Sequence, residues 1–255
     1  MQSFSVWKHS KKDQHYPCLN VKEYLNTKDF HPKLNFIHIT LSVLSDKIMH
    51  KIKNDSTVVL LLDTDNDDGL AEHRHIFNKI IKAKIDAPII IGRYYGNLTP
   101  LDLQLYSSTD IGALFIEGLG NGIYLAAENS GSLNQMNSTS FGILQASRIR
   151  ITKTEYISCP SCGRTLFDLQ DTTAMIRSKT DHLKGIKIGI MGCIVNGPGE
   201  MADADYGYVG TGVDKISLYR GQKMVESSID SKFATEALIN LIKEDGNWIE
   251  PKKKE

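Results

Sequence analysis

The chain has 255 residues, enough for one large domain or two domains of ordinary size, each with its own hydrophobic core. Thirty basic residues balance thirty acidic ones, so there is no long-range field to attract nucleic acid or an anionic membrane surface. Four cysteines are too few for a disulfide scaffold, and three of them cluster. This usage is typical of a reducing compartment in which thiols serve metal or redox chemistry.

The sequence also argues against a membrane or secretory protein. Its N-terminus has no apolar core of signal-peptide length. The longest apolar runs, at residues 58–62 and 88–91, are far too short to cross a bilayer. We therefore expect a cytoplasmic protein.

The first part of the chain divides into an arm and a repeating region. Residues 1–33 are polar with little periodicity and are predicted to be a loop or a poorly ordered arm, in which Cys18 is an unpaired thiol. From residue 34 onward, apolar runs alternate with segments of helical periodicity. We expect strands at 34–39, 57–62, 88–91 and 113–116, and helices at 41–53, 70–83, 101–106 and 141–150. This alternation implies parallel βαβ units, so residues 34–150 are predicted to form a partial, barrel-like βα region.

Residues 151–255 are predicted to form a compact mixed α/β domain. Gly221-Gln222 supplies a tight turn, so the two strands that flank it are expected to form a hairpin. The expected elements are strands at 185–191, 205–210, 215–219 and 223–226, and helices at 168–177 and 231–244.

Two loops resemble ligand-binding motifs, but the spacing of their residues does not match either motif. In the acidic loop from Asp63, an EF-hand would need glycine at the sixth position and glutamate at the twelfth, where Asp68 and Arg74 stand. We interpret it as a solvated loop in which Asp68 caps the next helix. Residues 118–122, Gly-Leu-Gly-Asn-Gly, place the last glycine one residue too early for a dinucleotide fingerprint. We expect a tight turn after a strand.

The chemistry concentrates between residues 156 and 200. Cys159 and Cys162 have the Cys-x-x-Cys spacing, at which one turn of backbone can aim both thiolates at one metal centre. Cys193 follows in a later loop that continues Asn196-Gly-Pro-Gly-Glu200. Such a rigid, side-chain-poor turn lets backbone amides approach a bound group, and it could return the Glu200 carboxylate to the same centre.

Spacing alone leaves the kind of site open. Three thiolates suit either zinc or an iron–sulfur cluster. His182 could complete a structural zinc site, although it lies far from Cys193 along the chain and a solvated histidine is the simpler interpretation. A ferredoxin-type electron carrier usually has four cysteines per cluster, and the fourth here, Cys18, lies in another region. Glu200 could equally be a surface acid.

A family resemblance narrows these alternatives. Residues 159–164, Cys-Pro-Ser-Cys-Gly-Arg, residues 191–200, Met-Gly-Cys-Ile-Val-Asn-Gly-Pro-Gly-Glu, and residues 202–207, Ala-Asp-Ala-Asp-Tyr-Gly, resemble the C-terminal part of the 4-hydroxy-3-methylbut-2-enyl diphosphate synthase family. That family serves the non-mevalonate route of isoprenoid biosynthesis. The resemblance covers about residues 110–250, and residues 34–110 are more loosely similar to the extra domain of three-domain members.

The resemblance implies an iron–sulfur oxidoreductase. It implies that Cys159, Cys162, Cys193 and Glu200 hold a [4Fe–4S] cluster, with Glu200 as the displaceable ligand of one iron. It also implies reductive opening of 2-C-methyl-D-erythritol 2,4-cyclodiphosphate, with one oxygen lost as water and electrons supplied by ferredoxin or flavodoxin. Asn196 is a candidate for contact with the substrate or the cluster.

The sequence departs from the family in one respect. The family's N-terminal barrel carries the arginines that bind the diphosphate, and an eight-fold barrel needs about 250 residues. The region before Ile151 holds too few βα units for it. We therefore expect the C-terminal portion of a three-domain member, which needs that missing barrel for activity.

Overall fold

A computed structural model describes residues 1–195 and 197–251. They divide into two compact units, Met1–Arg150 and Ile151–Glu255. Asn196, the candidate for substrate contact, lies outside the described residues. No helix in the described ranges is long and apolar enough to cross a membrane.

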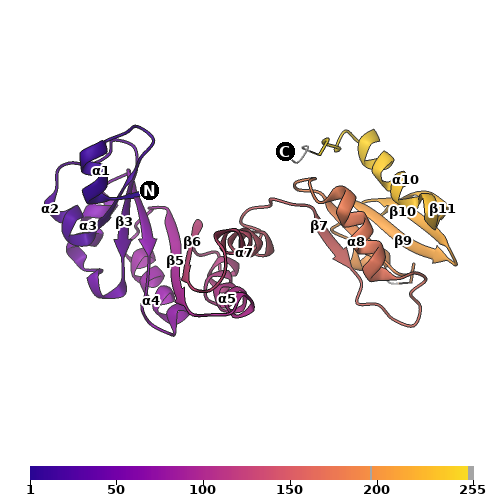
Figure 1. Cartoon of the computed structure of the whole chain (residues 1–255), viewed down its shortest axis with the longest axis horizontal. Helices are drawn as coiled ribbons and strands as arrows, with labels where there is room; N and C mark the ends of the chain where they lie inside the picture. Colours follow the sequence, from indigo (N-terminus) through magenta and orange to yellow (C-terminus); the bar gives the residue numbers. More distant parts are fainter. Residues whose placement is uncertain (196, 252–255) are drawn as a thin grey trace. The chain divides into compact units, whose positions relative to one another are not determined.

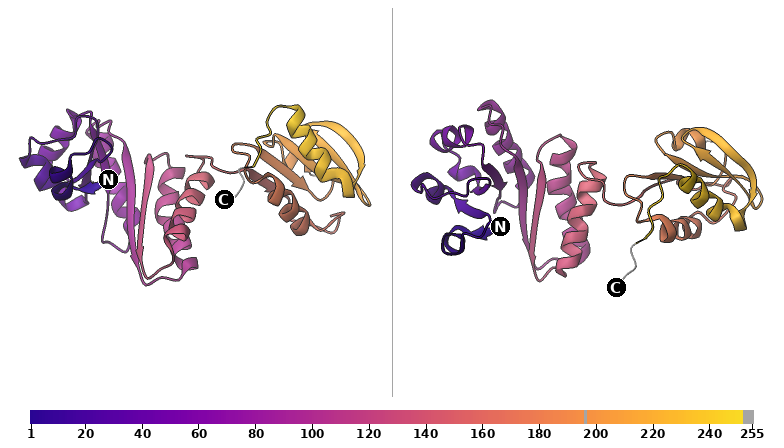
Figure 2. Two further views of the ribbon diagram at one scale, coloured as in Figure 1. Left: turned by 45° about the horizontal axis from the view of Figure 1, so that its top comes forward. Right: turned by 90° about the horizontal axis from the view of Figure 1, so that it is seen from above.

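Unit 1 is built on a six-stranded sheet whose strands follow one another in sequence order and all run parallel. Right-handed crossovers between successive parallel strands place the helices on one face. Figures 1 and 2 show a curled sheet with helices along its convex side, so the predicted barrel-like βα region is confirmed. The strands are β1 (Gln2–Ser3), β2 (Pro17–Asn20), β3 (Asn35–Ile39), β4 (Val58–Leu62), β5 (Ile89–Gly96) and β6 (Gly122–Glu128).

The helices of unit 1 bury one apolar face against this sheet. Alternate strand residues such as Ile37, Leu60 and Ile91 are fully buried in one cluster with Ile76 of helix α4. The helical elements are α1 (Phe4–Ser10), α2 (Val21–Asn26), η1 (Leu41–Val43), α3 (Asp46–Lys53), α4 (Gly69–Lys82), α5 (Pro100–Ser107), the π-helical turn η2 (Ser108–Gly112), α6 (Ala113–Ile116) and α7 (Leu133–Ala146).

Residues 1–33 differ from the predicted poorly ordered arm. They contain two strands and two helices, with Trp7 only 3% exposed and Tyr24 fully buried. The side chain of Asn20 accepts a hydrogen bond from the backbone of Glu23, whose side chain accepts one from the backbone of Asn20. The Tyr24 hydroxyl donates to Asp55 at 2.8 Å. These short elements are ordered by caps and buried aromatic rings, which a search for periodicity overlooks.

Residues 113–116 also differ from expectation, because they form helix α6 and not a strand. A short apolar run cannot be assigned to strand or helix by periodicity. Gly118 and Gly120 have φ angles of +77° and +90°, so they turn the chain out of this helix. The sixth strand is β6, which starts at Gly122 and was not predicted.

His73 on α4 is a buried base. It is fully buried, and neither ring nitrogen has a hydrogen-bond partner among the described residues, whereas His75 is exposed. Burial, followed by the charge of Arg93, lowers the pKa of His73 to about 4. In an unfolded chain the pKa of histidine is about 6.5. Between these two values the unfolded chain binds a proton that the folded chain does not.

This difference predicts a pH-dependent stability. The free energy of unfolding should fall as the pH drops from about 6.5 to about 4, with His73 contributing a loss of about 3 kcal/mol. The hydrogen bond to Asp63 raises the pKa of His38, which opposes this loss. We expect His73→Leu to flatten the dependence in urea denaturation at pH 7 and 4.5, whereas His75→Leu should retain it. If the free energy of unfolding of His73→Leu depended on pH as strongly as that of the parent, His73 would not be the source of the dependence.

Unit 2 is a mixed sheet of five strands in the order β11-β10-β9-β8-β7. Strands β7, β8 and β9 run parallel, and β9, β10 and β11 run antiparallel, so the predicted hairpin is confirmed. The core is formed by one sheet face and the helices that cover it, with Ile176, Ile188 and Leu238 fully buried. The elements are β7 (Glu155–Ser158), α8 (Leu169–Thr180), β8 (Lys187–Met191), α9 (Gly197–Glu200), β9 (Tyr206–Gly212), β10 (Lys215–Arg220), β11 (Lys223–Asp230) and α10 (Ser231–Glu244).

Candidate metal centre

Two cysteine loops meet at one edge of the sheet of unit 2. Cys159 follows β7 directly, and Cys193 follows β8 after Gly192. Because β7 and β8 are parallel neighbours, their carboxyl ends lie side by side. The backbone N–H of Cys159 donates to Ile190, and the N–H of Gly192 donates to the Cys159 sulfur, each at 3.4 Å. The second loop is thus fixed against the first sulfur.

The turn from Cys159 to Cys162 is held by Thr165. Ser161 has φ +66°, the left-handed conformation that reverses the chain within this turn. The Cys162 N–H donates to the Thr165 hydroxyl at 3.0 Å, and the Thr165 N–H donates to the Cys162 carbonyl at the same distance. This residue was not predicted from the sequence, because its role depends on a hydrogen bond that forms only in the folded turn.

The four predicted ligands line one small cavity. Its volume is about 100 Å³, and Cys162 is the exposed cysteine. The lining residues are Cys159, Pro160, Ser161, Cys162, Arg164, Thr165, Cys193, Gly197 and Glu200. Within the described part of the chain, no three His, Cys, Asp or Glu side chains converge closely enough to hold a single metal ion.

His182, the alternative zinc ligand, does not line the cavity. Its Nε2 lies 2.7 Å from the carbonyl oxygen of Ile249. Its ring packs edge-on against Trp248, with ring centroids 5.1 Å apart. These contacts engage His182 with the residues that follow α10, and Cys193 is not among its partners in the described ranges.

Arg164 favours an ionised sulfur in this cavity. Its backbone N–H, followed by its guanidinium, lowers the pKa of the Cys162 thiol. A hydrogen bond to the Cys162 sulfur, followed by the electrostatic influence of Cys162 and Cys193, raises the pKa of Arg164. A thiolate is the form that binds metals. Arg164 belongs to the Cys-Pro-Ser-Cys-Gly-Arg motif, but its role could not be predicted from the sequence.

Gly192 and Gly197 permit close contacts between the loops. A Cβ on Gly192 would lie 2.6 Å from Thr165 Cγ2, and one on Gly197 would lie 2.8 Å from Met191 Cβ. Real Cβ atoms essentially never approach other atoms so closely. These two glycines therefore allow packing of the chain on itself. The expected approach of loop amides to a bound group remains a prediction.

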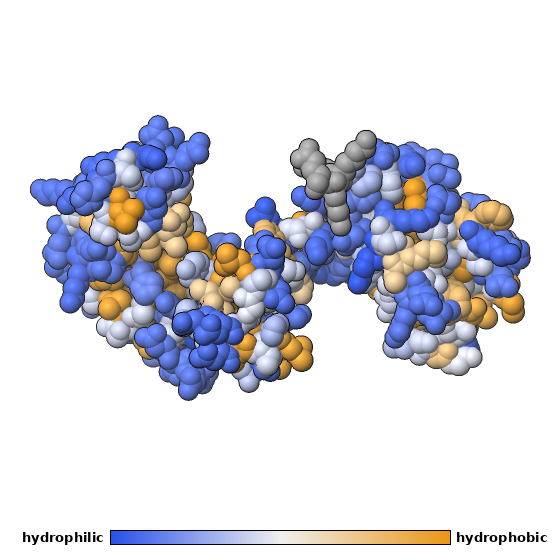
Figure 3. All heavy atoms as spheres, in the orientation of Figure 1, coloured by the Kyte–Doolittle hydropathy of each residue, from blue (hydrophilic) through white to orange (hydrophobic). Residues whose placement is uncertain are grey.

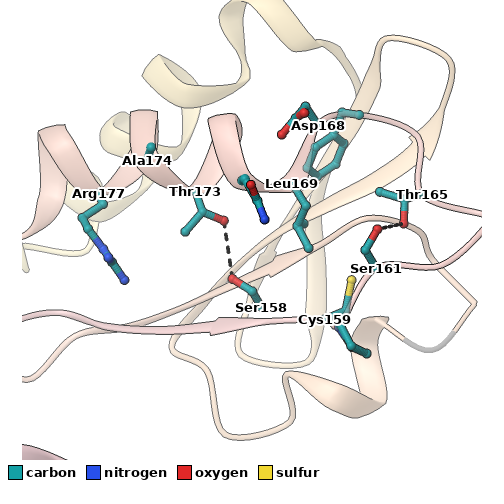
Figure 4. Close-up of a pocket in the computed structure, with 12 residues that line it drawn as sticks. Ser158, Cys159, Ser161, Thr165, Asp168, Leu169, Thr173, Ala174 and Arg177 are labelled. Atoms are coloured by element: carbon teal, nitrogen blue, oxygen red, sulfur yellow. Dashed lines mark hydrogen bonds between the residues drawn. The ribbon is translucent and has the colours of Figure 1, made fainter. Parts of the chain in front are cut away.

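A larger pocket adjoins the cavity. Its volume is about 700 Å³, and it lies between β7 and α8. It shares Cys159, Pro160, Ser161 and Thr165 with the cavity. Figure 4 shows the Cys159 sulfur pointing towards Ser161 and Thr165, with Arg177 at the far end of the pocket. The Arg177 guanidinium lies 5.0 Å from the Tyr156 ring centroid. The pocket thus gives solvent access to one side of Cys159.

Comparison with known proteins places unit 2 in a known family. Residues 155–244 match the family described as "GcpE protein C-terminal domain". Those residues belong to the GcpE C-terminal family. They cover most of unit 2, from β7 to the end of α10.

The chain is also similar to three longer proteins along much of its length. It is 48% identical over 234 residues to the 4-hydroxy-3-methylbut-2-en-1-yl diphosphate synthase (flavodoxin) of Parabacteroides distasonis, covering 92% of this chain and 38% of that protein. It is 42% identical over 257 residues to the synthase of the same name from Bacteroides fragilis strain ATCC 25285. This match covers 98% of this chain and 41% of that protein. It is 55% identical over 150 residues to the chloroplastic synthase (ferredoxin) of Oryza sativa subsp. japonica. This match covers 59% of this chain and 20% of that protein. The predicted resemblance is confirmed, and the chain spans well under half the length of these relatives.

Proposed function

We propose that this chain is the cluster-binding, C-terminal portion of a 4-hydroxy-3-methylbut-2-enyl diphosphate synthase. The supporting observation is that Cys159, Cys162, Cys193 and Glu200, carried by two loops at the ends of neighbouring strands, line one cavity. A [4Fe–4S] cluster bound there would supply electrons and an open Lewis-acidic iron. The donor set fits such a cluster, because each of its four ligands binds a different iron and the ligands need not converge on one ion.

The chain's own residues would hold and tune this group. The three thiolates would be its firm ligands, and the harder carboxylate of Glu200 would be the labile one. The Gly192 N–H already donates to the Cys159 sulfur, and Arg164 offsets negative charge at Cys162 and Cys193. Hydrogen bonds and charge of this kind set the potential of iron–sulfur sites. Asn196 is proposed to contact the substrate or the cluster.

Substrate and partners follow from the relatives. We propose 2-C-methyl-D-erythritol 2,4-cyclodiphosphate as substrate and flavodoxin or ferredoxin as electron donor, the two donors that the names of the relatives carry. The diphosphate would be bound by a barrel outside these residues, and residues 34–150 would correspond to the extra domain of three-domain members. A reducing location, the cytoplasm, suits the exposed thiol of Cys162.

Anaerobic reconstitution with iron and sulfide tests the proposal. We expect broad visible absorption from thiolate-to-iron charge transfer, with iron and sulfide bound in equal amounts. Binding of stoichiometric zinc without colour, and no stable iron, would favour a structural zinc domain. The reconstituted chain should turn over the cyclic diphosphate slowly or not at all with a chemical reductant, and near-full turnover would overturn the need for the barrel.

Glu200 separates an enzyme from a simple electron carrier. In a hybrid, this chain replaces the matching segment of the Parabacteroides distasonis relative, so that the rest of that protein is present. We expect Glu200→Cys to keep the iron content and lower turnover by at least about 100-fold, because a fourth thiolate closes the open iron. Glu226→Cys, an exposed acid on β11, should change neither quantity. Unchanged turnover in Glu200→Cys would show that a displaceable ligand is not needed.

A further inference from the structure

Unit 1 contains a pocket that the cysteine site does not use. It has a volume of about 810 Å³ and lies at the carboxyl ends of β4 and β5, bounded by α5 and η2. We call it the β4–β5 pocket, and its lining includes Asp65, Asp67, Tyr94, Leu105, Tyr106 and Asp110. In parallel βα folds, ligands bind at the carboxyl ends of the strands. The volume also falls within the range typical of small-molecule sites.

The floor of the β4–β5 pocket is fixed by Arg93, whose side chain is 7% exposed. The guanidinium pairs with the Asp110 carboxylate at 2.9 Å and donates to the Asn66 carbonyl at 3.0 Å. The Tyr95 hydroxyl donates to the same carboxylate at 2.7 Å. A Cβ on Gly69 would overlap this guanidinium, so only glycine at the start of α4 leaves room for it. Because Arg93 is committed to these partners, it does not offer the pocket a free positive charge.

The charge that remains at the rim is negative. Asp65 and Asp67 are exposed, and neither has an ion-pair partner within the described ranges. A further carboxylate, Glu128, accepts a hydrogen bond from the Tyr94 hydroxyl at 2.7 Å. This bond holds the Tyr94 ring at the pocket wall. The pocket therefore repels anions and attracts cations.

The wall of the pocket is aromatic and apolar. Tyr94 is 55% exposed and Tyr106 is 47% exposed, and Leu105 beside them is also exposed. Figure 3 shows apolar surface over the region of α5. The face of an aromatic ring attracts a cation through its quadrupole. Carboxylates at the rim and tyrosines at the wall together select a positive group attached to an apolar body.

We propose that the β4–β5 pocket binds a small organic cation, an amidinium, guanidinium or ammonium group carried on an aromatic or aliphatic body. The cation lies between Asp65, Asp67 and the tyrosine rings, and its apolar part contacts Leu105. Binding at this site requires neither a metal nor the cysteine loops.

The test uses the 255-residue chain without iron, so its result does not depend on the cluster proposal. Three soluble probes of the same shape are titrated: benzamidine, which is cationic, benzamide, which is neutral, and benzoate, which is anionic. Amide NMR shifts locate the binding, and calorimetry gives the affinity. We expect benzamidine to shift the amides of Gly96 and Thr109 and to bind at least about tenfold more tightly than benzamide. The difference in affinity between benzamidine and benzamide should decrease as salt is added.

Variants assign the affinity to named groups. The double variant Asp65→Asn/Asp67→Asn and the variant Tyr106→Leu should each weaken benzamidine about tenfold, while Tyr106→Phe, which keeps the ring, should bind normally. Asp86→Asn, an exposed acid just before β5 at the opposite end of the sheet, should have no effect. Urea midpoints near the parent's verify that the variants fold. Equal binding of benzamide, tighter binding of benzoate, or unchanged affinity in the double variant would overturn the proposal.

Discussion

Cys193→Ser is expected to reduce the iron bound after reconstitution to less than about a tenth of the parent's value. Serine keeps the size of the side chain but replaces a soft, readily ionised sulfur with a hydroxyl that stays protonated at neutral pH. Cys159→Ser and Cys162→Ser should behave in the same way, because all three sulfurs line the same cavity. Iron and sulfide analysis with the visible spectrum measures the loss.

Two controls make this result specific. Cys18→Ser changes the remaining cysteine, a half-buried thiol on β2 whose pKa is raised by burial, and it should leave the iron content unchanged. His182→Ala removes the alternative zinc ligand and should also have no effect on metal content. Loss of metal in His182→Ala, or normal iron in Cys193→Ser, would contradict the proposed ligand set.

Elements with long or continuous apolar patterns could be predicted from the sequence. The helix expected at 231–244 is α10 with the same bounds, because it combines apolar residues at helical spacing with an N-cap at Asp230. The apolar run at 57–62 contains β4, a strand covered on both faces. In α10 the helical spacing continues long enough to exclude a strand.

Short elements could not be predicted from the sequence, because they are stabilised by partners that are distant in sequence. Strand β7 has only four residues, of which Tyr156 and Ile157 are the apolar ones, and it is a strand because it pairs with β8. Helix α6 has four residues and could not be distinguished from a strand by period. The buried Arg93–Asp110 pair likewise joins β5 to the π-helical turn η2, a contact that no local pattern encodes.

The residues that supply the proposed donor atoms could be identified from the sequence, but the residues that orient them could not. The spacing of Cys159 and Cys162 indicates shared ligation, since a short turn forces neighbouring sulfurs together. That Cys193 joins them follows from the parallel pairing of β7 and β8, which is a tertiary feature. The roles of Thr165 and Arg164 depend on hydrogen bonds and charge within the folded loops. The motif therefore predicts the ligands, and the fold supplies what orients them.

Among the residues that orient the proposed ligands, Gly192 is the one whose substitution is expected to have the largest effect on stability and iron uptake. Its N–H donates to the Cys159 sulfur, and its carbonyl accepts from Leu166 at 3.0 Å. A Cβ at this position would lie 2.6 Å from Thr165 Cγ2, so Gly192→Ala must push the two cysteine loops apart. We expect the free energy of unfolding to fall by about 1–3 kcal/mol. Iron uptake should fall with it, because the displaced loops no longer present their sulfurs together.

A compensating change tests whether space is the cause. Thr165→Ser removes the methyl group that the new Cβ meets and keeps the hydroxyl that accepts from Cys162. The double variant Gly192→Ala/Thr165→Ser should therefore regain part of the stability and iron content, a positive coupling in a double-mutant cycle. Gly199→Ala serves as the matched control and should resemble the parent, because a Cβ there has no neighbour within 4 Å among the described residues. Additive losses in the double variant would show that Gly192 acts through its backbone and not through the room it leaves for Thr165.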